Sequence, residues 1–373
     1  MSTYLISCGG TGGHLSPGIA LAEALAGRGH TAVLLISHKR VDARLVEKYP
    51  HLRFERIPGS PFTLKPVGLF GFVVSQSRGF FFSMRLVRAL KPAGIVGFGG
   101  FTTAALIVAG KLCGVPVVLH EANRVPGRAI RLLGRLARRV YLPLGVTISV
   151  RSSAVRHVGL PVRKEICRQP QKEARLRLGL EPNLKVLAIF GGSQGATVLN
   201  DWARRELPLL AADGVQLYCV TGLGKGAAEV MTLKSQGGIP VKAMFVPFCD
   251  QVADLLSASD LVVARAGAGS IAELIRCGTP SVVVPYPRAA DNHQQANAAY
   301  FAQEGGGVVV EQSDLPALSR EVRGLIFDDA RLQALRKNLQ NMDRADPLDL
   351  ILTDIEALTS SIGVVRAKGT TAP

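Results

Sequence analysis

The sequence predicts an α/β fold made of two doubly wound, Rossmann-like parallel-sheet domains, and three observations carry this prediction. The 373 residues exceed what one ordinary hydrophobic core accommodates and suit two domains. Short apolar runs are repeatedly followed by a glycine-rich turn and a helical pattern, which is typical of parallel sheets. This order starts at the N-terminus and starts again at Lys185. We therefore expect one domain over residues 1–162 and a second over 163–344.

In the first half, apolar runs predict four strands. These runs cover residues 4–8, 32–36, 93–98 and 115–120. Glycine turns follow the first and the third run. A helix is expected from about Ser16 to Ala26, with Pro17 in its first turn, and another is expected to end near Cys113.

The second half repeats this order. Strands are expected over residues 185–190, 216–221, 242–246, 261–264 and 281–285. The glycine loops 191–195 and 265–269 each open a helix. A polar helix is expected over 331–342. A last helix, at about 345–361, is expected to pack back on the first domain.

The stretch 264–297 carries the clearest signal for a ligand. Its glycine loop and a later polar turn would both lie at the carboxyl edge of a parallel sheet, where ligands bind in open α/β folds. A helix N-terminus there offers free N–H groups to an anion. Glu273, Gln294 and Gln295 would suit sugar hydroxyls, so we expect a nucleotide-linked ligand with a diphosphate. The alternative is a capping box, in which Glu273 folds back onto the helix start at Ser270.

Composition limits the class of protein. The net charge is +16, and residues 1–162 hold 21 Lys and Arg against 5 Asp and Glu, whereas the remainder holds 23 of each. A basic half indicates contact with a polyanionic surface. The six cysteines are scattered without a Cys-x-x-Cys pair, which favours buried free thiols in a reducing compartment. With no signal peptide and no membrane-spanning run expected, the sequence predicts a cytoplasmic protein.

Residues 61–90 interleave apolar and cationic side chains. Six of the fourteen phenylalanines fall here. A second segment, 124–139, places four arginines at helical spacing opposite apolar residues. Such surfaces insert apolar groups into a bilayer and meet anionic headgroups. The alternatives are a core helix with a solvated face, or nucleic-acid binding, which dense apolar blocks disfavour. The expected membrane patch comprises Phe62, Leu64, Leu69, Phe70, Phe72, Arg78, Arg85 and Arg88.

Other motifs exclude or leave open rival functions. Residues 9–13 do not satisfy the dinucleotide fingerprint, since Leu15 stands where the third glycine is required, and no P-loop motif occurs. Residues 191–195 do fit the nucleophile elbow of α/β-hydrolases, with Ser193 followed by Asp260 and His293 in the correct order. Against a hydrolase, the fold restarts at Lys185 and the other glycine loops would have no role. We interpret the motif as a phosphate-binding helix start.

Taken together, the motifs resemble the MurG family of glycosyltransferase family 28. They are Gly10-Thr11-Gly12-Gly13-His14, His120-Glu121-Ala122-Asn123, Gly191-Gly192-Ser193-Gln194-Gly195-Ala196, and residues 265–273 and 291–295. The resemblance spans nearly the whole chain in order. It implies a GT-B fold with two domains facing across a cleft, and transfer of GlcNAc from UDP-GlcNAc to the MurNAc C4 hydroxyl of lipid I, giving lipid II. Alternatives are another GT-B sugar-nucleotide enzyme, an epimerase or natural-product glycosyltransferase.

The resemblance also implies roles for individual residues. The diphosphate would meet Ser193 and Gln194, with Arg163 and Arg265 close to it. Glu273 would bind the ribose, Gln294 and Gln295 the GlcNAc, and the backbone at Phe248–Cys249 the uracil. In the first domain, Thr11, Gly12, Gly13, His14 and Asn123 match positions for substrate binding and chemistry.

His14 would be the general base, because an ordinary imidazole titrates near neutral pH; the alternative is a structural histidine at a helix start. No cofactor and no metal are implied. The implied partners are UDP-GlcNAc, lipid I and the anionic cytoplasmic face of the inner membrane, where the protein would be peripheral, with no nucleic acid. Ala122, Leu160 and Ala266 depart from the usual family pattern.

Overall fold

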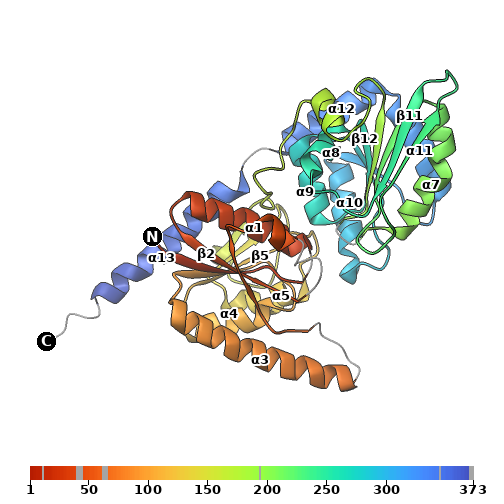
Figure 1. Cartoon of the computed structure of the whole chain (residues 1–373). Helices are drawn as coiled ribbons and strands as arrows, with labels where there is room; N and C mark the ends of the chain where they lie inside the picture. Colours follow the sequence, from red (N-terminus) through yellow and green to blue (C-terminus); the bar gives the residue numbers. More distant parts are fainter. Residues whose placement is uncertain (11, 39–44, 61–65, 193–194, 344–345, 369–373) are drawn as a thin grey trace. The chain divides into compact units, whose positions relative to one another are not determined.

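The chain folds into two compact units, each built around its own sheet (Figure 1). The computed structural model describes all residues except 11, 39–44, 61–65, 193–194, 344–345 and 369–373. Unit 1 comprises Met1–Arg163 with Ala345–Pro373, and unit 2 comprises Lys164–Arg344. The division therefore falls one residue beyond position 162.

Within the described residues of unit 1, seven parallel strands form one sheet in the order β3-β2-β1-β4-β5-β6-β7. The chain starts in the middle of this sheet, builds one side, and then crosses to the other. The order therefore reverses between β1 and β4, which is where open α/β sheets bind ligands. The strands are β1 (Thr3–Ser7), β2 (Thr31–Ile36), β3 (Arg53–Arg56), β4 (Gly94–Gly97), β5 (Val117–His120), β6 (Arg139–Leu142) and β7 (Val155–His157).

Helices cover both faces of this sheet. Because successive strand residues point to opposite faces, Tyr4 and Ile6 pack in one core with α1 and α13, whereas Leu5 packs in the other with α3, α4 and α5. Figure 1 shows α3 and α4 on the side of the sheet away from α1. The helices are α1 (Gly12–Gly27), α3 (Pro66–Leu90), α4 (Thr103–Leu112), α5 (Arg128–Leu133) and α13 (Pro347–Lys368), with short 3-10 turns at Gly134–Leu136 and Ser152–Ala154.

Helix α13 is held on unit 1 by polar contacts as well as by its apolar face. Asp354 accepts hydrogen bonds from Arg139 Nε at 3.0 Å and from Tyr141 Oη at 2.9 Å. Tyr4 Oη lies 3.1 Å from Thr359 Oγ1. The C-terminal helix is therefore part of unit 1 although the chain passes through unit 2 before reaching it.

Unit 2 repeats the arrangement with one difference. Its described residues form a second seven-stranded sheet, in the order β10-β11-β9-β8-β12-β13-β14, and β10 is antiparallel. The sequence pattern did not predict β10, which is antiparallel because a tight turn with Gly238 at φ 75° sends the chain straight back. The strands are β8 (Val186–Phe190), β9 (Gln216–Val220), β10 (Glu229–Lys234), β11 (Pro240–Val246), β12 (Leu261–Ala264), β13 (Ser281–Val283) and β14 (Gly307–Val309).

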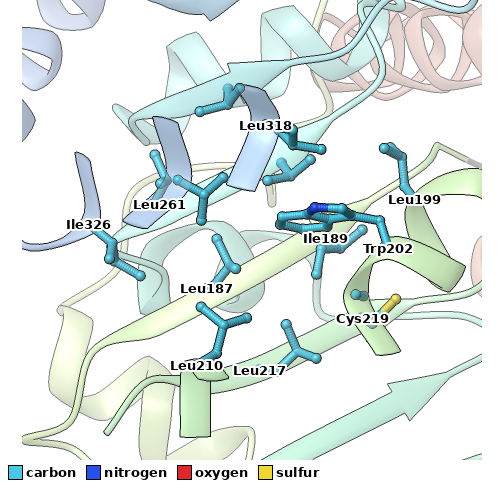
Figure 2. Packing of buried hydrophobic residues seen from close by; sticks show 14 of the residues in the cluster. Leu187, Ile189, Leu199, Trp202, Leu210, Leu217, Cys219, Leu261, Leu318 and Ile326 are labelled. Atoms are coloured by element: carbon cyan, nitrogen blue, oxygen red, sulfur yellow. The ribbon is translucent and has the colours of Figure 1, made fainter. Parts of the chain in front are cut away.

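The core of unit 2 is centred on Trp202. This side chain is 1% exposed, and it lies among leucine and isoleucine side chains of β8, β9 and α11 (Figure 2). Its indole N–H donates to Ser319 Oγ at 3.0 Å. The helices of unit 2 are α6 (Gln171–Arg177), α7 (Thr197–Ala212), α8 (Val252–Ala258), α9 (Ala268–Cys277), α10 (His293–Gln303), α11 (Leu315–Ile326) and α12 (Asp329–Met342), with a 3-10 turn at Ala290–Asn292.

Two helices differ from expectation. Helix α1 begins at Gly12 rather than near Ser16, so Pro17 lies in its second turn and His14 in its first. The helix expected over 124–139 is a six-residue α5 followed by a 3-10 turn, and Arg139 already belongs to β6. A Cβ at Gly134 would lie 3.0 Å from Val150 Cγ1, so the backbone at Gly134 packs tightly against the Val150 side chain.

Asp260 is the buried anion that holds the amino-terminal edge of the second sheet. Its carboxylate accepts bonds from Arg175 Nη2 at 2.6 Å and from the Val186 amide at 2.7 Å. Asp260→Asn should lower the free energy of unfolding by about 3–5 kcal/mol, because Arg175 would keep a buried charge without its partner. Urea unfolding followed by the fluorescence of the single tryptophan, Trp202, measures this in unit 2.

The matched control is Glu229→Gln, which removes the exposed pair between Glu229 and Arg204. It should cost less than about 1 kcal/mol. Equal losses in the two variants would contradict a structural role for the Asp260 pair.

Candidate functional site

In unit 2 the strand order reverses between β8 and β12, and a glycine loop follows each of these strands. After β8, a Cβ on Gly191 would lie 2.5 Å from the Ala196 amide nitrogen, and one on Gly195 only 2.0 Å from the Thr221 carbonyl oxygen. Gly192 and Gly195 also have positive φ angles, 77° and 64°. Side chains are thus excluded at Gly191 and Gly195, where the backbone packs closely against its neighbours.

After β12, the chain enters α9 without a side-chain cap. The N-cap is Gly267, which has no side chain to bond the first-turn N–H groups. The capping-box alternative is therefore wrong: the helix begins at Ala268, so Ser270 is already inside it. Glu273 is 9% exposed, one turn further along. The uncapped N–H groups give this end of α9 the electrostatics of an anion site.

Arg265 fixes the segment that follows β13. Its Nη1 donates to the carbonyl oxygens of Val284 at 3.1 Å and Pro285 at 3.3 Å, and its Nη2 to Gln312 Oε1 at 2.5 Å. The guanidinium carbon lies 5.4 Å from the centre of the Tyr286 ring. Burial lowers the pKa of Arg265, which nevertheless remains a cation at neutral pH. This charge lies at the carboxyl edge of the sheet.

The two predicted sugar-binding carboxamides lie at the start of α10. Gln294 Oε1 accepts a bond from the Tyr286 amide at 2.9 Å, and Gln295 Nε2 donates to Glu311 Oε1 at 2.6 Å. Asp291 and Asn292, just before them, both have left-handed backbones, with φ of 50° and 52°. Consecutive residues of this kind are uncommon and cluster at ligand sites.

The structure gathers Arg265 and Gln294 around the 284–286 segment, with Gln295 beside them on α10 and Glu273 on the adjoining helix α9. Ser193 and Gln194 lie outside the described residues. Phe248 and Cys249 follow β11, where the Cys249 thiol lies 3.9 Å from Tyr218 Oη. Arg163 belongs to unit 1, where it is 7% exposed and donates to Tyr49 Oη at 3.0 Å. Its place beside the diphosphate stays a prediction.

The α/β-hydrolase alternative fails on the position of Asp260. This residue precedes β12 and bonds the amide that begins β8, so it lies at the amino-terminal edge of the sheet. The 191–195 loop follows the carboxyl end of β8. Because β8 and β12 are parallel neighbours, these two positions are at opposite edges. A Ser–His–Asp triad through Asp260 cannot form within this unit.

In unit 1 the equivalent reversal lies between β1 and β4, and it is occupied by His14. Thr11 lies outside the described residues, and Gly12 and Gly13 begin α1. A Cβ on Gly99 would lie 3.4 Å from His14 Nε2, and one on Gly100 3.3 Å from His14 Nδ1. The half-buried imidazole therefore rests on the glycine loop that follows β4.

Sequence reasoning did not assign roles to His120 and Glu121, although both stood in the quoted motif. Glu121 is 5% exposed; its Oε1 accepts bonds from the amide and the side chain of Asn123, at 2.8 and 3.0 Å, and its Oε2 one from the Gly127 amide. His120 Nε2 lies 3.0 Å from the Gly159 carbonyl oxygen. Burial lowers the pKa of His120 to about 4, so it is neutral at pH 7. Glu121 thus fixes the loop that presents Asn123, and His120 holds the segment at Gly159.

On the face of the first sheet away from α1, helix α3 exposes much of its apolar surface. Phe70, Val73 and Phe81 are 74%, 54% and 71% exposed, and Leu69 is 39% exposed. Phe72 is half-buried, and Arg78, Arg85 and Arg88 are exposed, whereas Phe62 and Leu64 lie outside the described residues. An open groove of about 470 Å³ runs between α3 and α4. It is lined by Phe72, Gln76, Ser77, Phe80, Phe81, Ala104, Ala105 and Val108.

Comparison with known proteins decides the family. Residues 4–142 match the glycosyltransferase family 28 N-terminal domain, and residues 186–350 match its C-terminal domain. The chain is 60% identical, over 99% of its length and 98% of the relative's, to a UDP-N-acetylglucosamine–N-acetylmuramyl-(pentapeptide) pyrophosphoryl-undecaprenol N-acetylglucosamine transferase of Opitutus terrae. The chain belongs to the MurG family of glycosyltransferases. A relative of the same name from Desulforudis audaxviator is 34% identical over 95% of the chain and 98% of that protein.

Solved structures agree with the MurG-family fold. The crystal structure of Acinetobacter baumannii MurG superposes with a TM-score of 0.71 at 22% identity, covering 95% of this chain and 99% of that one. CalG4, the calicheamicin glycosyltransferase, gives 0.68 at 15% identity, covering 97% and 99%. At these identities the likeness shows the fold alone. The predicted GT-B class, with two parallel-sheet α/β domains, and the resemblance to the MurG family are both confirmed.

Proposed function

We propose that this protein transfers GlcNAc from UDP-GlcNAc to the MurNAc C4 hydroxyl of lipid I and so produces lipid II. The observation that carries this proposal is the 60% identity, over nearly the whole of both chains, with the Opitutus terrae enzyme named for that transfer. The partners are accordingly UDP-GlcNAc and undecaprenyl-diphospho-MurNAc-pentapeptide.

We assign the donor to unit 2. The glycine loop after β8 and the uncapped start of α9 offer backbone N–H groups to the diphosphate. The Arg265 guanidinium adds a positive charge at the same edge. Glu273 would accept hydrogen bonds from the ribose, and Gln294 and Gln295 would exchange their present contacts for the GlcNAc hydroxyls.

We assign the chemistry to His14 of unit 1. The imidazole would remove the proton of the acceptor C4 hydroxyl as its oxygen attacks C1 of GlcNAc from the face opposite UDP, and UDP leaves with the bonding electron pair. This displacement inverts the anomeric centre. The helix-start N–H groups of unit 2 would stabilise the charge that develops on the leaving diphosphate.

A continuous UDP-release assay tests the proposal. UDP should appear only when UDP-GlcNAc and a lipid I analogue are both present, and UDP-GalNAc or a TDP-sugar should support far less release. Equal release with a TDP-sugar and a small aglycone would instead favour a natural-product glycosyltransferase. Conversion of UDP-GlcNAc without any acceptor, to an epimer or to free UDP, would also contradict the proposal.

We further propose that helix α3 rests on the anionic cytoplasmic face of the inner membrane, so that the protein is peripheral. Helices α3, α4 and α5 contain no acidic residue, and exposed apolar residues on them lie beside exposed arginines. Exposed apolar residues flanked by cations suit an interface of acyl chains and phosphate headgroups. Among the described residues, no helix is long and apolar enough to span a bilayer.

Vesicle flotation tests this surface. The double variant Phe70→Asp/Phe81→Asp should bind vesicles that contain phosphatidylglycerol about tenfold or more weakly, because two large apolar side chains no longer insert. Turnover with a short-chain, water-soluble acceptor should stay unchanged. Val230→Asp is the control, since Val230 is 62% exposed on unit 2. Flotation of the double variant at the level of this control would contradict the assignment.

A further inference from the structure

Three buried hydroxyl groups lie beneath the two glycine loops of unit 1. Ser7 is the last residue of β1, and Thr102 and Thr103 lead into α4; none is more than 1% exposed. Ser7 Oγ lies 3.2 Å from Thr102 Oγ1 and 3.1 Å from Thr103 Oγ1. The three side chains therefore form one cluster between neighbouring strands.

This cluster joins the two loops to each other. Thr102 Oγ1 donates to the Gly9 carbonyl oxygen at 3.3 Å, and Thr103 Oγ1 donates to the Gly99 carbonyl oxygen at 2.5 Å. Each threonine uses its single hydroxyl proton in these bonds, so Ser7 Oγ donates its own single proton to one of the two threonine oxygens at a time. A chain of hydroxyls thus runs from the loop after β1 to the loop after β4.

The Thr102 side chain does not cap helix α4 and takes part in this row of hydroxyl groups instead. A threonine at the N-cap of a helix usually accepts a bond from an N–H group of the first turn. Thr102 is the N-cap of α4, yet its side chain makes no such bond. Its hydroxyl instead donates to the Gly9 carbonyl oxygen. This favours a role for Thr102 in joining the two loops rather than in capping α4.

The loop after β4 is the one that lies against His14. Gly99 and Gly100 have φ angles of 95° and 80°, which favour glycine, and the imidazole nitrogens approach both residues. A Cβ on Gly100 would also lie 2.7 Å from the Gly9 carbonyl oxygen. The second loop is therefore close to both the imidazole and the first loop, which leads into the helix that carries His14, so the spacing of the loops sets the place of the ring.

We infer that Ser7, Thr102 and Thr103 are positioning residues that hold His14 in its reactive place through the backbone of the two glycine loops. The inference rests on the proposed role of His14. A general base must lie within hydrogen-bond reach of the proton that it removes, and a displacement of about 1 Å can cost a hundredfold in rate. The hydroxyl groups themselves touch no substrate.

Paired variants at position 103 test the inference. Thr103→Val keeps the shape but leaves the Gly99 carbonyl without its donor; kcat should fall about 10- to 100-fold, with the KM for UDP-GlcNAc within about twofold. Thr103→Ser keeps the hydroxyl and should restore kcat to near the wild-type value. Ser7→Ala removes only the bridging hydroxyl and should give a smaller fall in kcat, which covers the case in which Thr103→Val folds poorly.

Thr279→Val in unit 2 is the matched control. Thr279 is 2% exposed, and its hydroxyl donates to the Leu256 carbonyl oxygen at 2.9 Å, so this variant loses an equally buried bond. It should leave kcat unchanged. A kcat for Thr103→Val equal to that of Thr279→Val, together with unmoved imidazole NMR signals of His14, would overturn the inference.

Imidazole NMR provides a readout that does not depend on catalysis. In protein labelled at histidine, the His14 signals are assigned by their loss in His14→Ala. They should move in Thr103→Val and stay in place in Thr279→Val. Unmoved signals would overturn the positioning role. Moved signals with unchanged turnover would support positioning and contradict His14 as the base, which separates the two proposals.

Discussion

His14→Ala should lower kcat by about 10²- to 10⁴-fold, the range that a positioned general base contributes. The imidazole lies at the strand reversal of unit 1, against Gly99 and Gly100. Affinity for UDP-GlcNAc, measured by calorimetry, should stay within about twofold, because the donor is assigned to unit 2.

His14→Gln and His157→Ala complete this experiment. Glutamine keeps hydrogen-bonding groups but cannot take the proton, so its kcat should be as low as that of alanine. His157 is an exposed histidine of the same unit, and its Nδ1 lies 3.0 Å from the Pro143 carbonyl oxygen. Its alanine variant should turn over normally. Turnover of His14→Ala within tenfold of wild type would remove His14 from the role of base.

Glu273→Gln should raise the KM for UDP-GlcNAc about 10- to 100-fold, since hydrogen bonds to a charged group contribute about 1.5–3 kcal/mol. The side chain keeps its shape, and α9 should keep its position, because Gly267 rather than Glu273 precedes its first turn. The kcat at saturating donor should change little, since the ribose is bound alike in the ground and transition states.

A donor that lacks the 2′-hydroxyl identifies the partner of Glu273. The wild-type enzyme should discriminate against the 2′-deoxyribose analogue of UDP-GlcNAc, and Glu273→Gln should discriminate much less. Glu304→Gln, at an exposed position in unit 2, is the control and should behave as wild type. Unaltered discrimination in Glu273→Gln would place the ribose elsewhere.

The strand–glycine–helix order predicted most of the fold because each of its signals lies within a few consecutive residues. Each parallel strand is a short apolar run, and each glycine loop stands where positive φ or close backbone contact demands it, as at Gly99 and Gly195. Strand β10 escaped prediction because its alternate residues are exposed at the sheet edge, so no apolar run marks it. The start of α1 was placed late because Pro17 is typical of a first turn but lies in the second.

Sequence reasoning proposes residues whose side chains suit a ligand, and it misses residues whose side chains hold the backbone. Glu273, Gln294 and Gln295 have side chains whose chemistry suggests a sugar nucleotide. The hydroxyls of Ser7, Thr102 and Thr103 carry no such signal, because serine and threonine are common in loops and caps. Only the fold brings β1 and β4 together as neighbours, and with them these three residues.

The most direct test of the proposed transfer is to trace isotope-labelled GlcNAc from the donor to the product. The wild-type protein, given UDP-GlcNAc labelled with ¹³C in the GlcNAc ring and a lipid I analogue in anionic vesicles, should release one UDP for each GlcNAc transferred. NMR of the product should show the label β-linked to C4 of MurNAc. Release of UDP with free labelled GlcNAc, an α linkage, or attachment to any other position would contradict inverting transfer to lipid I.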